Sequence, residues 1–197
     1  MRKLTAILAP VLMLGACCTN VNLTMTPEEI KLIDESSDVM RILTTDNAED
    51  LAVLRSQSRD FSLADIETVE YRNLASKLIT TLQSTDGGVG LAAPQVGIKR
   101  RVVAVQRVDK EGEPIEVYPN IRIEEFRGEL QAGPEGCLSV PDRRGEVLRS
   151  QDITIVYTDA SLDQPREIRE DVSGFAAVIF QHEVDHLDGI LYIDKLQ

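Results

Sequence analysis

The chain has 197 residues, enough for one domain with a sizeable core, and 43% of them are hydrophobic. Its formal net charge is −12, from 33 acidic and 21 basic residues, which argues against nucleic acid as a partner. Two of the three cysteines, Cys17 and Cys18, are adjacent and fit disulfide geometry poorly. The composition therefore indicates a globular protein without a disulfide framework.

The first residues resemble a bacterial export signal. Arg2 and Lys3 precede an apolar run at residues 4–14, which is too short to span a bilayer. The run ends in small residues before Cys17, as in the lipobox of bacterial lipoproteins. This resemblance implies cleavage after residue 16, lipidation of Cys17 and an exported, membrane-anchored lipoprotein of the cell envelope. The alternative, an N-terminal helix, is disfavoured because a proline interrupts the run and no amphipathic period appears.

Two helices are predicted in the part of the chain that follows. A capping pattern at residues 26–29 begins a helix that extends to about Met40. No secondary structure is predicted for residues 41–61. Ser62 is expected to cap a second helix, at about 63–83, in which apolar residues recur at helical spacing.

The rest of the chain is predicted to contain several strands and then one helix. Segments rich in valine and isoleucine predict strands at about 101–108, 115–118, 121–126, 152–158 and 168–172. The last helix is predicted at about 174–187, with Ser173 as its cap and Gly189 just beyond its end. This order of elements predicts an α+β fold with antiparallel or mixed sheets.

The strongest motif, His182-Glu183-Val184-Asp185-His186, lies on this last helix. Two histidines four residues apart lie about 40° apart around a helix, so both can face one metal ion. Glu183 lies about 100° from His182, on the flank of that face, where it can reach a water without being a ligand. The alternative is a pair of core histidines, but these are the only two histidines in the chain.

Two further segments contain residues suited to the same chemistry. A hydrolytic metal usually has three protein ligands, and Cys137 is the one cysteine outside the signal region. Taken alone, a buried free thiol is the simpler interpretation of that cysteine. Residues 88–95, Gly-Val-Gly-Leu-Ala-Ala-Pro-Gln, lack the ending of a phosphate-binding loop. Their Gln95 could polarise a carbonyl, or it could be a surface side chain in a tight connection.

Taken in series, these motifs resemble the peptide deformylase family. The resemblance rests on Gly-x-Gly-x-Ala-Ala-Pro-Gln, Glu-Gly-Cys-Leu-Ser and His-Glu-x-x-His, in this order, and covers roughly residues 63–196. It implies an α+β fold whose sheets surround the C-terminal helix with the histidine motif. It also implies hydrolysis of the formyl group of N-formylmethionyl peptides, which releases formate. We accordingly divide the chain into a signal peptide (1–16), an N-terminal extension (17–61) and a catalytic domain (62–197).

The resemblance also implies a role for each matching residue. The metal ligands are Cys137, His182 and His186, and the general acid/base is Glu183. The oxyanion donors are the Gln95 side chain and the Leu138 backbone N–H. The residues implied to bind the substrate are Gly90 and Arg144, and the implied ion pair is Arg149 with Asp185. Ligand types alone suggest zinc, whereas the resemblance implies one ferrous ion, with zinc, nickel or cobalt able to substitute.

The sequence departs from the family at its beginning, which leaves other functions open. Residues 17–61 lack the usual proline-containing segment, and an export signal is unusual, so an exported enzyme could act on another formyl-peptide substrate. A zinc endopeptidase would take its third ligand downstream, where only Asp188 and Asp194 are acidic among the eleven residues after His186. A non-catalytic binding module would have a broken metal set.

Overall fold

The computed structural model describes residues 23–161 and 164–197. The predicted signal peptide at residues 1–16 and the predicted lipidation site Cys17 lie outside the described residues. Within those described ranges, no helix has both the length and the apolar character needed to cross a membrane.

The described residues form five α-helices, two 3-10 helices and six strands. The α-helices are α1 (Pro27–Glu35), α2 (Ala48–Leu54), α3 (Leu63–Ile66), α4 (Val69–Gln83) and α5 (Gly174–Leu187). The 3-10 helices are η1 (Ala93–Val96) and η2 (Tyr192–Asp194). The strands are β1 (Gly90–Ala92), β2 (Val102–Gln106), β3 (Ile115–Pro119), β4 (Arg122–Cys137), β5 (Val140–Asp159) and β6 (Arg166–Ser173).

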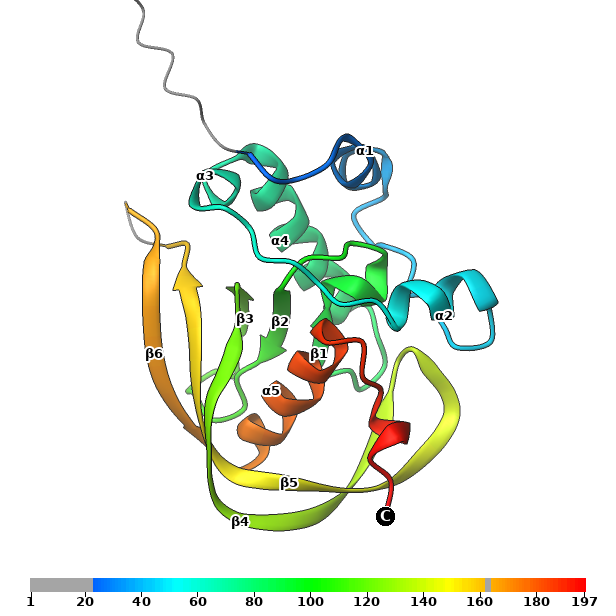
Figure 1. Cartoon of the computed structure of the whole chain (residues 1–197), viewed down its shortest axis with the longest axis vertical. Helices are drawn as coiled ribbons and strands as arrows, with labels where there is room; N and C mark the ends of the chain where they lie inside the picture. Colours follow the sequence, from blue (N-terminus) through cyan, green and yellow to red (C-terminus); the bar gives the residue numbers. More distant parts are fainter. Residues whose placement is uncertain (1–22, 162–163) are drawn as a thin grey trace, which may run out of the picture.

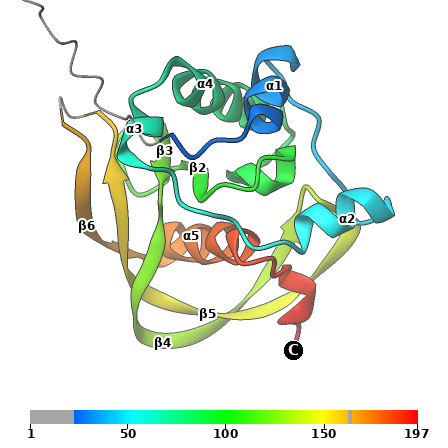
Figure 2. The ribbon, with the colours of Figure 1, turned by 45° about the horizontal axis from the view of Figure 1, so that its top comes forward.

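The strands form two antiparallel sheets, which confirms the predicted α+β fold. One sheet has the order β1-β2-β3 and the other β4-β5-β6, with three strands in each. Helix α5 lies between the two sheets, and β4 and β5 form a long curved ribbon beneath it (Figures 1 and 2). This helix buries Ala177, Phe180 and Leu187 completely, because most of its residues are apolar around the whole circumference.

Several helical details differ from the sequence-based expectations. The first helix, predicted to extend to about Met40, ends at Glu35. The predicted helix at 63–83 is two helices, because the Thr68 hydroxyl accepts a hydrogen bond from the Tyr71 N–H and starts α4 anew. Ser173 occupies the N-cap position of α5, but its hydroxyl donates to Asp152 instead of capping the helix. Residues 41–61, for which we predicted no element, include α2, which Asn47 caps with its side-chain oxygen.

The described part of the N-terminal region packs directly against the rest of the chain. Met25 and Ile33 belong to the same hydrophobic cluster as Leu74 and Leu78 of α4. A polar contact reinforces this packing, since the buried Arg100 guanidinium bonds the Glu29 carboxylate at 2.7–3.1 Å. The segment from residue 24 onward is therefore held against the body that carries the motifs.

Candidate metal centre and active site

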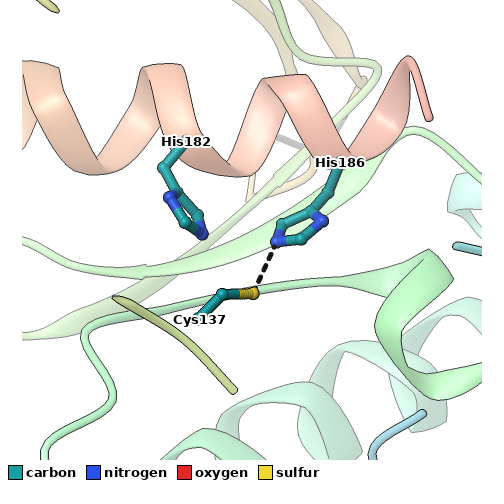
Figure 3. Close-up of side chains that lie close together, drawn as sticks. All are labelled: Cys137, His182 and His186. Carbon is teal, nitrogen blue, oxygen red and sulfur yellow. Dashed lines mark hydrogen bonds between the residues drawn. The ribbon is translucent and has the colours of Figure 1, made fainter. Parts of the chain in front are cut away.

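Cys137 and the two histidines of α5 meet at the turn that joins β4 and β5. Cys137 ends β4, and His182 and His186 lie one turn apart on the facing side of α5 (Figure 3). One donor atom from each of the three lies within 4.8 Å of the other two. The Cys137 Sγ atom is 3.2 Å from Nε2 of His186. The three side chains proposed as metal ligands from the sequence are thus brought together.

The chemistry of this group fits a divalent transition metal. A thiolate and two imidazoles are ligands that zinc and ferrous iron accept. The Nδ1 atom of His182 is 2.8 Å from Glu135, which leaves the other ring nitrogen for a metal. Burial, followed by the charge of His182, lowers the pKa of His186, so its imidazole is neutral and able to bind.

The surroundings of His182 favour a positive charge. Burial opposes a charge on His182, but its interactions with Cys137 and Glu135 outweigh burial and raise its pKa to about 10. Burial also opposes ionisation of Glu135, but hydrogen bonds with His182 and Arg149 lower its pKa to about 2. An ionised Glu135 beside His182 therefore supplies the negative charge that a bound cation needs.

Glu183 lies beside the three side chains but outside the group of possible ligands. It is 4% exposed, and its Oε2 atom has no hydrogen-bond partner among the described residues. Burial raises the pKa of Glu183 to about 7, so its carboxyl group can exchange a proton near neutral pH. A Cβ atom at Gly90 would lie 2.4 Å from Oε1 of Glu183, so only glycine leaves the carboxyl group its space.

Gln95 is held in a fixed orientation at the same place. Its Oε1 atom accepts a 2.8 Å hydrogen bond from the Ala92 N–H, and its Nε2 atom donates to Ser139 at 3.1 Å. The same amide nitrogen is 3.7 Å from the Cys137 Sγ atom. The NH₂ group of Gln95 therefore points toward the metal centre, with Leu138 nearby on the β4–β5 turn.

A cleft of about 800 Å³ opens onto these groups. Gly90, Gln95, Leu138 and Glu183 line it, and Arg144 lies at its exposed rim. The first turns of α5 add an apolar wall, which consists of Phe175, Val178 and Ile179. The cleft therefore combines an apolar wall with the reactive groups, the usual composition of a small-molecule or peptide site.

Known proteins are similar to this chain in both sequence and fold. The family described as polypeptide deformylase matches residues 39–197. Peptide deformylase 2 of Gloeobacter violaceus is 37% identical over 147 residues, which is 74% of each chain. The chain belongs to the peptide deformylase family. Members are metal-dependent hydrolases, and this chain is therefore a metal-dependent amide hydrolase of the peptide deformylase type.

Solved peptide deformylase structures resemble most of this fold. The enzyme from Thermotoga maritima is 32% identical, with a TM-score of 0.70, and the match covers 81% of this chain and 98% of that one. A class I type b enzyme from Acinetobacter baumannii with Met-Ala-Ser bound is 34% identical, with a TM-score of 0.68. That match covers 80% of this chain and 98% of that one.

The family match begins earlier than the motifs suggested. It starts at residue 39 and includes α2, whereas the motif-based resemblance begins near residue 63. The two acidic residues that an endopeptidase would need as ligands lie elsewhere, since Asp188 pairs with Arg101 and Asp194 with Arg55. Peptide deformylase is thus favoured over a zinc endopeptidase.

One important contact of the deformylase site was not found from the sequence. Glu135, which bonds His182, also accepts hydrogen bonds from Arg149 at 2.7 and 3.0 Å. Arg149 in turn bonds Asp185 at 2.6 Å, the ion pair that the family resemblance implied. Glu135 could have been identified only as part of the Glu-Gly-Cys-Leu-Ser motif. Its position in the sequence does not indicate that it contacts His182, which lies 47 residues away.

Proposed function

We propose that this chain removes the formyl group from N-formylmethionyl peptides and releases formate and a free amino terminus. The observation that carries the proposal is the group of Cys137, His182 and His186 with the buried Glu183 beside it, at the wall of a cleft that Cys137, His182 and Glu183 line. Cys137, His182 and His186 would hold one divalent metal, ferrous iron by family resemblance, with zinc, nickel or cobalt as substitutes. Such a metal supplies Lewis-acid polarisation and a water of lowered pKa.

The protein's own groups perform the proton transfers and stabilise the developing charge. The Glu183 carboxylate accepts a proton from the attacking water and later donates one to the leaving amine nitrogen. The Gln95 amide and the Leu138 backbone N–H donate hydrogen bonds to the carbonyl oxygen as it becomes negative. Gln95 is already oriented for this role by its bonds to Ala92 and Ser139, so little reorganisation is needed.

The cleft is suited to a peptide that begins with an unbranched apolar residue. The wall of Phe175, Val178 and Ile179 can take a methionine side chain. Gly90 has a backbone that a substrate can approach closely, and the exposed Arg144 can contact the peptide beyond the first residue. The Acinetobacter baumannii enzyme that has Met-Ala-Ser bound supports a peptide of this type.

Three matched peptides test this function. With metal bound, we expect the chain to release formate from formyl-Met-Ala-Ser and to leave acetyl-Met-Ala-Ser and Met-Ala-Ser intact, measured by formate assay and mass spectrometry. Cleavage between Met and Ala would instead indicate an endopeptidase. Binding of formyl-Met-Ala-Ser without any hydrolysis would indicate a non-catalytic binding module, and either result would contradict the proposal.

We also propose that the mature chain is attached to a membrane through acylated Cys17. The support is the order of basic, apolar and small residues before that cysteine. Only residues 18–23 separate Cys17 from Thr24, which is bonded to the buried Asp65. The seven residue steps from Cys17 to Thr24 span at most about 25 Å, so the active domain would stay close to the lipid surface.

Cys17→Ser tests the attachment. We expect this variant to lose the acyl group and to move from the membrane fraction to the soluble fraction, because the acyl chains that provide stable anchoring can no longer be attached. Cys18→Ser is the matched control and should stay membrane-bound. Cell fractionation and mass spectrometry of the N-terminus measure both. Unlipidated wild-type protein in the soluble fraction would contradict the proposal.

A further inference from the structure

The C-terminal turn after α5 contacts the face of His182. The chain leaves α5 at Gly189, which has a φ of +72°, and returns as η2. The ring of Tyr192 stacks on the His182 ring, with centroids 6.0 Å apart and an interplanar angle of 23°. Tyr192 is 1% exposed, and it belongs to a small apolar cluster against which Cys137 also packs. One aromatic ring thus supports two members of the metal centre.

The same turn is also connected to His182 through a series of side chains with alternating charges. The Lys195 ammonium group donates to Oδ1 of Asp185 at 2.7 Å, and Oδ2 of Asp185 accepts from Arg149 at 2.6 Å. Arg149 donates to both oxygens of Glu135, and Oε2 of Glu135 is 2.8 Å from Nδ1 of His182. Only the outer end of this series is substantially exposed, since Lys195 is 39% exposed and Arg149 is 4% exposed.

We infer that the C-terminal turn, Tyr192–Lys195, positions the metal ligand His182. This inference rests on the proposed role of His182. The stacked ring of Tyr192 restricts rotation of the imidazole, and Lys195 holds the outer end of the charge series that fixes its Nδ1 atom. Since every carboxylate in the series is shared between two partners, the loss of one end loosens the next contact inward. Tyr192 and Lys195 are positioning residues, since neither lines the cleft.

The hydroxyl of Tyr192 gives a test that separates the ring from the polar group. This oxygen is buried and has no hydrogen-bond partner among the described residues, so the ring alone should matter. We expect Tyr192→Leu to weaken cobalt binding about 10-fold or more, as losing an outer partner of a metal ligand commonly does. Tyr192→Phe should bind cobalt as the wild type does, with unchanged visible absorption bands of the bound ion.

Lys195 has a closely matched control in Lys110. Each lysine lies 2.7 Å from one carboxylate, and their side chains are 39% and 38% exposed. Lys195→Met should weaken cobalt binding about two- to five-fold, since a partly exposed ion pair contributes little by itself. Lys195→Arg should restore wild-type binding, and Lys110→Met should not change it. In an Asp185→Asn background, Lys195→Met should have no further effect, because the series is already broken.

The measurements are chelator competition and the absorption spectrum of the cobalt-loaded chain, with no substrate present. Thermal unfolding of each metal-free variant shows that binding is compared on folded protein. The inference is overturned if either Tyr192→Leu or Lys195→Met keeps wild-type affinity and spectrum. Failure of this inference can be told apart from failure of the proposed function. A wild-type chain that binds cobalt but hydrolyses no formyl peptide would contradict only the proposed function.

Discussion

Cys137→Ser is expected to lose most of its bound metal while keeping its fold. A serine hydroxyl stays protonated at neutral pH, so the change replaces a thiolate ligand with a weak neutral donor and leaves only two imidazoles. We expect metal affinity to fall by more than about 100-fold, beyond the 10–100-fold that the loss of an outer partner costs. Metal content after gel filtration measures the effect, and formate release should fall in parallel.

Ser139→Ala is the matched control for that variant. Ser139 is fully buried two residues beyond Cys137 and bonds Gln95, but it is not among the three possible ligands. The control should therefore bind metal normally. Thermal unfolding of the metal-free proteins should give similar midpoints, because Cys137 is a small side chain at the turn between β4 and β5. Full metal occupancy in Cys137→Ser would show that the cysteine is not a ligand.

The parts of the fold that could be predicted from the sequence are those with strong local patterns. Helix α5 was predicted at its observed bounds, since it combines a long apolar segment with Gly189 just after its end. Strands β2 and β3 were found for a similar reason, because they are short and rich in valine or isoleucine. Such elements are specified by their own residues and depend little on distant contacts.

The long β4–β5 ribbon could not be predicted over its full length. Most of β4 beyond residue 123 is exposed, so its side chains show no alternation of buried and exposed positions. Register shifts after Ile123 and Arg127 disturb the period further. The ribbon forms because β4 pairs with β5 along most of its length. Such pairing depends on both strands, so the sequence of either strand alone does not predict it.

The candidate site divides in the same way. His182, Glu183 and His186 lie within five residues on one helix, so helical geometry alone predicted that both histidines face one point. The participation of Cys137 and Gln95 needed the family resemblance, because separate elements bring these side chains to the helix. The contacts of Glu135 and Tyr192 with His182 were not foreseen at all, since they depend on tertiary packing.

Glu183→Gln should separate proton transfer from metal binding. Glutamine keeps the size of the side chain but cannot accept the proton, while Cys137, His182 and His186 are unchanged. We expect the metal to stay bound and formate release from a formyl-Met peptide to fall about 10²–10⁴-fold, the usual contribution of a positioned acid/base. Substrate affinity should change much less, because the proton moves in the transition state.

Two companion measurements make the result specific to the base. Glu183→Asp keeps a carboxylate but withdraws it by one methylene, so it should retain more activity than Glu183→Gln. The metal-free Glu183→Gln protein should unfold at the same temperature as the wild type or higher, since the buried Oε2 atom of Glu183 has no described partner and burial disfavours its charge. Wild-type formate release by Glu183→Gln would exclude Glu183 as the base. Loss of the metal would instead indicate that Glu183 is a ligand, and it would contradict the position of Glu183 on the flank of the histidine face.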